Sequence, residues 1–318
     1  MSVSTSNHVH ERYVHEAVYY DGASQLVEAT TPLLRQALVD GEDVALVCSE
    51  TNNQALVEAL GGDERLLVLP RPEIYTKAVT AVAYFRDFVQ ERVTAGAPRV
   101  CVLGEVDFGT DGRALNEWRR YEALLNHALS PFPLWSLCGY DTGVLGESVL
   151  TTADLTHPFV RRDGVQAPNL AQVDPAVLLR LADAADTLVD DREPALTVPI
   201  GGNLSELHRQ VRALLTGHGL GRDLVEDLLT AVHEVAINGV RHGEPPVTVR
   251  FWVAPERVEC TVTDRGPGVD DPFVGYVRGG GDELPEGRIG LWLARQLCDE
   301  VAMGRTPDGF TTRLVVDL

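Results

Sequence analysis

The first half of the chain alternates short apolar runs with longer amphipathic stretches. Runs such as DVALVCS and RVCVLGEVD are apolar at nearly every position, whereas residues 21–41, which precede the first of these runs, carry leucines at helical spacing. The expected strands cover residues 15–20, 43–49, 66–70, 99–107 and 133–141, and the expected helices cover 21–41, 52–62, 76–96 and 115–129. Continuous apolar strands that alternate with helices are typical of a mostly parallel sheet covered on both faces. The pattern therefore predicts an α/β domain.

The second half has a different rhythm, in which strands follow one another after short turns. The expected strands cover residues 195–200, 247–254, 257–264 and 311–318, and the expected helices cover 204–219, 221–243 and 291–304. Strands joined by short turns pair antiparallel, and the helices then gather on one face of the sheet. This half is predicted to be a two-layer α+β domain.

The segment between the halves has little periodicity. Residues 162–173 contain Gly, Pro and Asn and are interpreted as a linker, and a helix at 174–191 is predicted with Asp174 as its cap and Pro175 in its first turn. That helix could join the domains or mediate self-association in a homodimer. The expected organisation is a domain at 10–162, a linker and connecting helix at 163–194, and a second domain at 195–318.

Composition indicates a globular protein. Hydrophobic residues make up 44% of the 318 residues and charged residues 23%. No apolar run approaches the roughly 18 residues that span a bilayer, and the polar start MSVSTSNHVHERY lacks the apolar core of a secretory signal. We therefore expect a cytoplasmic protein without a membrane partner. The five cysteines are far apart and form no CxxC pair, so buried thiols are expected rather than disulfides or a zinc site.

Charge limits the class of partner. The formal net charge is −20, whereas contacts to nucleic-acid phosphates need a basic surface. Direct nucleic-acid binding is therefore not expected. An acidic surface does suit a basic protein partner, although acidity also serves solubility.

Three polar elements of the second half could carry chemistry. In HEVAINGVRHG, the side chains of Glu234, Asn238 and His242 follow one another at four-residue spacing along the predicted helix. In TDRGPGV, Asp264 ends a strand and is followed by Gly266 and Gly268. Taken singly, the first element could be a solvated helix edge and the second an ordinary tight turn.

The third element is a glycine-rich stretch that leads through Gly287, Arg288 and Gly290 into a helix. Amides at a helix start favour phosphate, and Arg288 is a candidate phosphate contact by charge and position. The chain contains no GxxxxGK followed by Ser or Thr, so it has no Walker A loop. A Rossmann fingerprint is also excluded, because a loop precedes these glycines rather than the first strand of a βαβ unit.

In this order, ExxxN on a helix, DxGxG after a strand and GxxGL at a helix start resemble the Bergerat ATP-binding fold of the GHKL superfamily of gyrases, ATP-driven chaperones, histidine kinases and MutL proteins. The resemblance covers about 195–318 and is strongest to the small bacterial anti-sigma-factor serine kinases of the RsbW and SpoIIAB type. It implies that ATP and Mg²⁺ are bound, with Asn238 on the metal and Asp264 on adenine. It further implies that Glu234 is the general base and that Gly266, Gly268, Gly287 and Gly290 shape the pocket and its lid. His242 could touch phosphate or simply lie at a solvated helix end.

The resemblance also implies partners, namely a sigma factor that is sequestered and an anti-anti-sigma antagonist that is phosphorylated on Ser or Thr. Two alternatives stay open: a non-catalytic ATP-binding module that switches partners, and an atypical sensor histidine kinase. The second needs a phosphoacceptor His on a dimerising helix followed by an acidic residue, whereas His208 precedes an arginine and His233 lies inside the ATP-site helix.

The first half resembles the MEDS domain, a sensory domain of bacterial regulators, over about 10–162. The segments that carry this resemblance are HEAVYYDG, GEDVALVCS, RVCVLGEVDFG, EWRRYEALLNHAL, LWSLCGYDT and LTHPFV. It implies a degenerate RecA-type or P-loop-type fold without its phosphate loop, which favours binding of a small-molecule or protein signal over hydrolysis. The strand-end acids Glu105 and Asp107 stand where such folds keep a catalytic carboxylate. A ligand pocket at the strand ends, or merely surface and capping roles, could involve His15, Tyr20, Glu105, Tyr140, Asp141 and His157.

Overall fold

The computed structural model describes residues 13–109, 112–185, 192–201, 204–277 and 288–318. The chain forms two compact units, with the division between Leu178 and Leu179. Each unit is described by itself. Among the described residues, no helix combines the length and the apolar character that crossing a bilayer requires.

The first unit is an α/β domain built on a sheet in the order β3-β2-β4-β5-β1-β6-β7. All described neighbours pair in parallel except β6 and β7, which pair antiparallel. The strands are β1 (Val14–Tyr20), β2 (Asp43–Val47), β3 (Leu66–Val68), β4 (Val100–Gly104), β5 (Leu134–Asp141), β6 (Phe159–Arg162) and β7 (Val165–Pro168). The predicted parallel sheet is confirmed.

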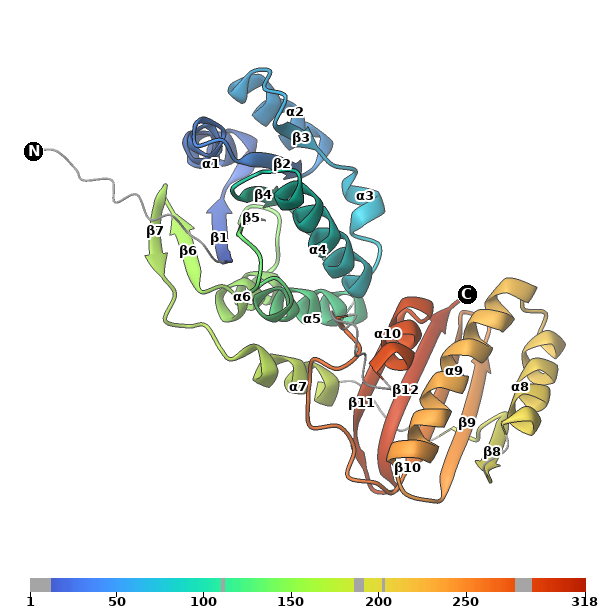
Figure 1. The fold of residues 1–318 in the computed structure, drawn as a ribbon. Coiled ribbons are helices and arrows are strands. Elements are labelled where there is room, and N and C mark those ends of the chain that lie inside the picture. Colours follow the sequence, from blue (N-terminus) through green and yellow to red (C-terminus); the bar gives the residue numbers. More distant parts are fainter. Residues whose placement is uncertain (1–12, 110–111, 186–191, 202–203, 278–287) are drawn as a thin grey trace, which may run out of the picture. The chain divides into compact units, whose positions relative to one another are not determined.

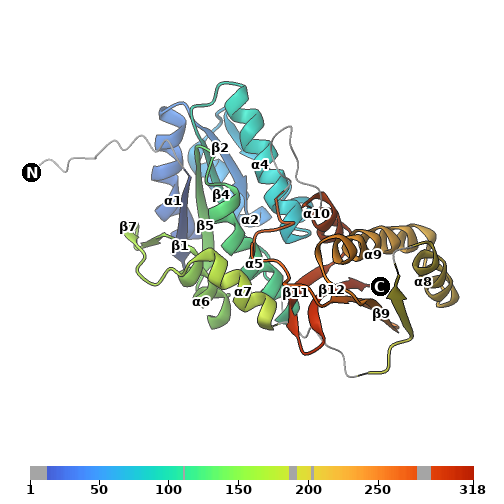
Figure 2. The same ribbon diagram turned by 60° about the horizontal axis from the view of Figure 1, so that its bottom comes forward.

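Helices cover both faces of this sheet because its crossover connections run in two directions. The helices are α1 (Gly22–Val39), α2 (Glu50–Leu60), α3 (Arg71–Ile74), α4 (Ala78–Thr94), α5 (Gly112–Ala128) and α6 (Glu147–Thr156). Right-handed crossovers place α1 and α2 on one face, and α4, α5 and α6 on the other. In Figure 2 the sheet runs between α1 on one side and α4 and α5 on the other.

After β1 the chain crosses one face of the sheet toward β2, and after β5 it crosses the opposite face toward β6. These two strands are neighbours, so their carboxyl ends form the point where the strand order reverses. Open α/β sheets bind ligands at such a point. The end of β4 lies beside it.

Two predictions for the segment after β6 met different outcomes. The interpretation of 162–173 as a linker was wrong for residues 165–168, which form β7 against β6. Short strands whose side chains are all exposed have no apolar pattern to reveal them, and every residue of β7 is exposed. The helix predicted at 174–191 is present as α7 (Pro175–Ala185), and its expected end at 186–191 lies outside the described residues. Asp174 Oδ1 accepts a hydrogen bond from Ala176 N at 2.7 Å, as expected of the cap.

The second unit is a two-layer α+β domain with an antiparallel sheet in the order β11-β12-β10-β9-β8. The strands are β8 (Leu196–Ile200), β9 (Val247–Ala254), β10 (Arg257–Asp264), β11 (Glu300–Thr306) and β12 (Gly309–Asp317). The helices are α8 (Ser205–Gly217), α9 (Arg222–His242) and α10 (Arg288–Leu297), which lie over one face of the sheet (Figure 1). This arrangement confirms the predicted fold class.

The prediction of a single helix at 291–304 was wrong in its second half. Helix α10 ends at Leu297, and Glu300–Thr306 forms β11 instead. Tertiary pairing decides this segment: β11 hydrogen-bonds to β12 along its whole length and buries Glu300, Val301, Ala302 and Met303. Pairing of this kind overrides the helical spacing of a short apolar run.

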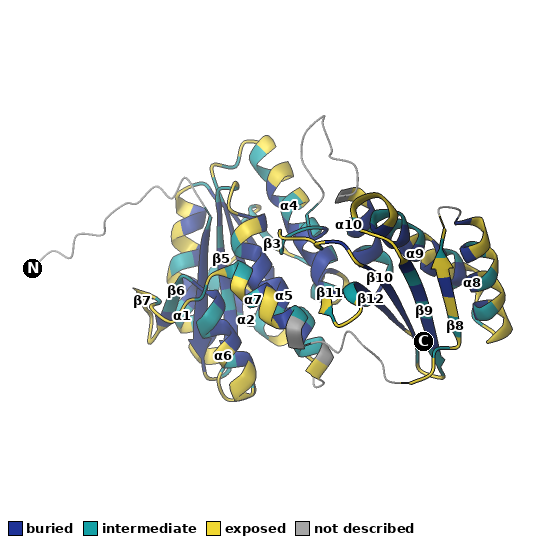
Figure 3. Cartoon of the chain, turned by 90° about the horizontal axis from the view of Figure 1, so that it is seen from below, coloured by how far each residue is buried: buried dark blue, intermediate teal, exposed yellow. Residues whose placement is uncertain are grey.

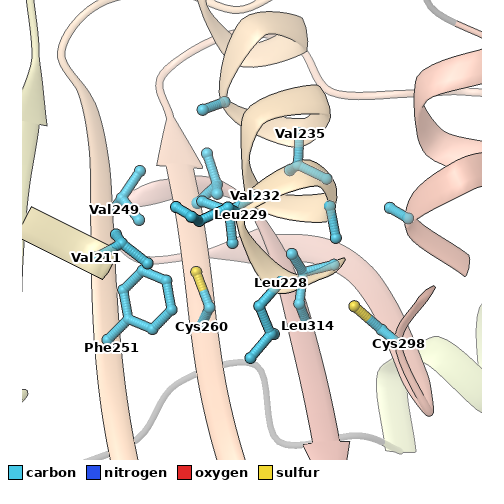
Figure 4. Close-up of a cluster of buried hydrophobic side chains, with 14 of the residues drawn as sticks. Val211, Leu228, Leu229, Val232, Val235, Val249, Phe251, Cys260, Cys298 and Leu314 are labelled. Carbon is cyan, nitrogen blue, oxygen red and sulfur yellow. The ribbon is translucent and has the colours of Figure 1, made fainter. Parts of the chain in front are cut away.

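The core of the second unit lies between α9 and the sheet. Leu229 and Val232 on α9 lie toward Phe251 and Cys260 on the strands (Figure 4). Figure 3 shows β10 and β12 largely buried, whereas β8 is only partly buried and the outer face of α8 is exposed. This packing fixes α9 above β10, so polar side chains at the edge of the helix lie close to the end of that strand.

Candidate functional site

Asp264, at the end of β10, is a buried carboxylate held by backbone amides. Its Oδ1 accepts hydrogen bonds from Gly266 N at 2.7 Å and from Glu244 N at 3.4 Å. A Cβ atom on Gly243 would lie 2.3 Å from the Asp264 Cγ, and one on Gly266 would lie 2.8 Å from Oδ1. Two glycines therefore let the backbone wrap around this carboxylate. Among the described residues, no hydrogen bond reaches its second oxygen, Oδ2.

A pocket of about 240 Å³ opens beside Asp264. Its lining consists of Val235, Asn238, Gly239, His242, Gly243, Val262, Asp264, Gly268, Val269, Val274, Leu291, Met303, Phe310 and Thr312. The walls are mostly apolar, and the polar groups are few. An apolar slot with one free carboxylate oxygen suits a flat aromatic ring that carries an amino group.

Helix α9 brings the predicted polar residues to this pocket in one line. Asn238 and His242 both line the pocket, one helical turn apart. Glu234 lies one further turn toward the helix start, half-buried and outside the pocket lining. A Cβ atom on Gly290 would lie 2.3 Å from Glu234 Oε2, so the carboxylate rests against the first turn of α10. The site is therefore apolar at one end and carries a carboxylate beyond the other.

The structure describes the predicted glycines and Arg288 to different extents. Gly268 lines the pocket in the left-handed region, with φ +80°, and a Cβ there would lie 2.2 Å from the Phe310 ring. Gly287 lies outside the described residues. Arg288 begins α10, and only its backbone is described.

Replacing Gly290 with alanine should displace the Glu234 carboxylate, because the added methyl group would occupy its position. A displacement on the order of 1 Å costs a catalytic group as much as 10²-fold. We expect phosphoryl transfer, the reaction that the resemblance implies, to fall by at least about tenfold. Gly217→Ala at the end of α8 is the matched control, since nothing lies within 4 Å of a Cβ there. Equal activity of both variants would contradict this role of Gly290.

The two histidines considered as phosphate acceptors lie together, away from the pocket lining. His208 Nε2 on α8 is 3.0 Å from His233 Nδ1 on α9. Burial, followed by the neighbouring His233, lowers the pKa of His208. Neither residue lies on a connecting helix before the domain, where a histidine kinase would need one.

Sequence reasoning missed most of the pocket wall. The alternation of a strand places Val262 on the same face as Asp264, and helical spacing places Val235 one turn before Asn238 and Gly239. Both patterns can be read from the sequence. By contrast, Thr312 and Phe310 become part of the pocket wall because β12 pairs with β10, which places them opposite Val262 and Asp264. Pairing register is not readable from either strand alone.

In the first unit, Tyr20, Glu105 and Asp141 lie at the carboxyl ends of β1, β4 and β5. Glu105 is occupied by the protein itself: Oε1 accepts hydrogen bonds from Asn52 Nδ2 at 2.6 Å and from the Tyr20 hydroxyl, and Oε2 accepts one from Ser49 N at 2.8 Å. Burial, followed by Glu105, raises the pKa of Tyr20. The carboxylate therefore braces these strand ends.

The structure places His15, Tyr140 and His157 in a separate group with Glu122 and Cys138, of which all but the half-buried Cys138 are buried. Burial lowers the pKa of each histidine to about 3 and raises the pKa of the Glu122 carboxyl. Both imidazoles are therefore neutral near pH 7. The six residues predicted for one strand-end pocket thus divide between two places.

Comparison with known protein families agrees with this division of the chain. Residues 14–158 match the model of the MEDS domain, the methanogen/methylotroph DcmR sensory domain, and residues 201–316 match the histidine kinase-like ATPase domain. The chain joins a MEDS domain to a histidine kinase-like ATPase domain. The first match lies within the parallel-sheet unit, and the second covers the pocket, α9 and β10.

Curated relatives match only part of this chain. A serine-protein kinase RsbW of Bacillus licheniformis is 38% identical over 98 residues, with 26% of this chain and 59% of the relative covered. RsbW of Bacillus velezensis is 36% identical over 108 residues, with 29% of this chain and 66% of the relative covered. RsbW of Bacillus subtilis is 35% identical over 96 residues, with 26% of this chain and 59% of the relative covered. The chain thus spans about 59–66% of the length of these relatives.

Proposed function

We propose that the chain is a sensory anti-sigma-factor regulator. Its ATPase domain uses ATP and Mg²⁺ to phosphorylate a Ser or Thr of an antagonist protein, and it sequesters a sigma factor when that antagonist is absent or phosphorylated. The MEDS domain supplies the signal. The observation that carries this proposal is the arrangement along α9, where Glu234, Asn238 and His242 run from the start of α10 to the pocket that contains Asp264.

The pocket residues fit the adenine of ATP. Asp264 Oδ1 is already held by two backbone amides, which leaves Oδ2 to accept a hydrogen bond from the adenine amino group. Val262, Met303 and Leu291 offer apolar surfaces to the faces of the ring. Recognition of the amino group by a fixed acceptor distinguishes ATP from nucleotides that carry a carbonyl at this position.

The residues beyond the adenine end fit the phosphates and Mg²⁺. Asn238 offers an amide oxygen, a ligand type that Mg²⁺ accepts, and the nucleotide phosphates and water usually supply the remaining ligands of such sites. When bound, Mg²⁺ neutralises charge on the phosphates. His242 extends the same line of side chains and can donate a hydrogen bond to a phosphate oxygen.

Glu234 is placed to act on the incoming hydroxyl group. It is the carboxylate next to the start of α10 and does not line the ring pocket, so it can serve transfer without serving adenine recognition. As general base it orients the Ser or Thr hydroxyl of the antagonist and accepts its proton as the phosphoryl group arrives. The matched relatives are themselves named serine-protein kinases, which supports this assignment.

The proposed partners are proteins rather than nucleic acid. With 47 acidic and 27 basic residues, the chain is suited to a basic surface such as that of a DNA-binding sigma factor. The antagonist needs only to present a hydroxyl group to Glu234.

A transfer assay tests the proposed function. The full chain is incubated with γ-labelled ATP and Mg²⁺ together with candidate antagonist proteins encoded near its gene, and the labelled residue is identified. We expect acid-stable label on a Ser or Thr of the antagonist. Nucleotide binding without transfer would instead establish a non-catalytic switching module, and acid-labile label on this chain would establish a histidine kinase.

A further inference from the structure

A second group of chemically active side chains lies in the first unit, unconnected with ATP. It consists of His15 on β1, Glu122 on α5, Cys138 on β5 and His157 directly after α6. The imidazole, thiol and carboxylate ligand atoms all lie within 4.8 Å of one another. Both histidines and Glu122 have fully buried side chains. The parallel sheet is thereby joined to two helices at one buried point.

Hydrogen bonds fix which atom each histidine presents to this group. His157 Nδ1 lies 2.9 Å from Ala153 O, and a carbonyl can only accept, so Nδ1 carries the proton. His15 Nδ1 lies 3.2 Å from Asn126 Oδ1, and Asn126 is oriented by donating from Nδ2 to Thr156 O at 2.7 Å. Each neutral ring therefore turns a bare Nε2 toward Glu122. Metal-binding histidines are commonly held in this way, through the nitrogen that does not bind the ion.

The carboxylate is oriented in the same manner. The Tyr140 hydroxyl donates to Glu122 Oε1 at 2.9 Å, which leaves Oε2 facing the two imidazoles. Glu122 Oε2 lies 3.5 Å from His15 Nε2 and 3.6 Å from His157 Nε2. In the described structure, neither Glu122 Oε2 nor His157 Nε2 has a hydrogen-bond partner. Buried acceptors that converge without a donor are costly unless a cation or a proton lies between them.

The spacing of the ligand atoms distinguishes an ion from a water molecule. Ligands about 2.0–2.3 Å from a tetrahedral ion lie roughly 3.3–3.7 Å apart. Four partners about 2.8 Å from a water oxygen would instead lie roughly 4.6 Å apart. The Cys138 Sγ to His15 Nε2 distance is 3.3 Å, and the two distances from Glu122 Oε2 are 3.5 and 3.6 Å. These three separations match an ion, and the remaining pairs of ligand atoms lie within 4.8 Å.

We propose that His15, Glu122, Cys138 and His157 form a closed, four-coordinate transition-metal site that binds Zn²⁺. Two imidazoles, one thiolate and one carboxylate are all ligands of zinc, whereas Mg²⁺ and Ca²⁺ prefer oxygen alone. All four positions come from the protein, so the ion has a structural role or is the signal itself rather than a catalyst with an open position. Binding replaces the Cys138 thiol proton, which is released to solvent.

Metal content of the full chain tests this site. Protein purified without a metal-affinity step should contain about one zinc ion per chain. His157→Ala and Cys138→Ala should each reduce this content at least tenfold. The matched controls are His127→Gln, an exposed histidine on α5, and Cys48→Ser, another cysteine of the same unit; both should retain the zinc.

Cobalt substitution of the wild type needs no variant to fold. After removal of zinc with a chelator, one equivalent of Co²⁺ should give the visible absorption of a tetrahedral complex with a thiolate-to-cobalt charge-transfer band, and Cys138→Ala should lack that band. Restoring zinc should raise the thermal unfolding temperature of the chelated chain. Absence of zinc together with no cobalt spectrum would overturn the site. Zinc retained by both ligand variants would place the ion elsewhere, and stoichiometric iron, copper or nickel would overturn the choice of zinc.

Discussion

Glu234→Gln should lower phosphoryl transfer to the antagonist by about 10²–10⁴-fold, the usual contribution of a general base. Glutamine keeps the shape of the side chain and its contact with the start of α10, but it cannot accept the hydroxyl proton. Because Glu234 is not part of the pocket lining, ATP affinity should change by less than about threefold, well below the effect of losing a charged hydrogen bond. Single-turnover transfer and calorimetry of nucleotide binding measure the two quantities separately.

Glu226→Gln is the matched control for this variant. Glu226 lies on the same helix, is partly exposed and pairs with Arg212 on α8. Exposed ion pairs contribute little to stability, so transfer and thermal unfolding should stay close to those of the wild type. A Glu234→Gln protein that transfers phosphate at the wild-type rate would remove Glu234 from the mechanism.

Asp264→Asn should weaken ATP binding by roughly 10- to 150-fold, because a hydrogen bond to a charged group contributes about 1.5–3 kcal/mol. The amide oxygen of asparagine can still accept from Gly266 N, which preserves the turn after β10. The group facing the pocket then becomes an amide N–H donor in place of a carboxylate oxygen. The adenine amino group, itself a donor, loses its acceptor.

Nucleotide preference separates this effect from general damage to the fold. Inosine triphosphate carries a carbonyl where ATP carries the amino group, so the wild type should bind it far more weakly than ATP. Asp264→Asn can donate to that carbonyl, and its preference for ATP should shrink or reverse. Asp227→Asn, at an exposed position of α9, should leave both affinities unchanged. An unaltered preference in Asp264→Asn would mean that Asp264 does not face the base.

Local patterns were sufficient for most of the fold. The continuous apolar runs at β2 and β4 gave a parallel sheet, and the closely spaced strands β9 and β10 gave an antiparallel pair. Local spacing also placed Asn238 and His242 on one side of α9. It failed at residues 300–306, where pairing with β12 turns the end of a predicted helix into a strand. Such pairing depends on a partner that local patterns do not contain.

The candidate metal site shows the same limit more sharply. Dispersed cysteines without a CxxC pair predict buried thiols, and Cys48, Cys101, Cys260 and Cys298 are indeed buried. Cys138 differs because the fold brings it to histidines 123 and 19 positions away, together with Glu122 from another element. Ligands recruited from two strands, a helix and a helix end leave no short motif. Only the assembled sheet reveals them.

The most direct test of ATP recognition is a structure of the full chain with a non-hydrolysable ATP analogue and Mg²⁺. We expect the adenine ring between Val262 and Met303, with its amino group within hydrogen-bonding distance of Asp264 Oδ2, and the phosphates toward Asn238 and the start of α10. A nucleotide bound elsewhere on the chain, or a pocket that stays empty at saturating nucleotide, would contradict the assignment of this site.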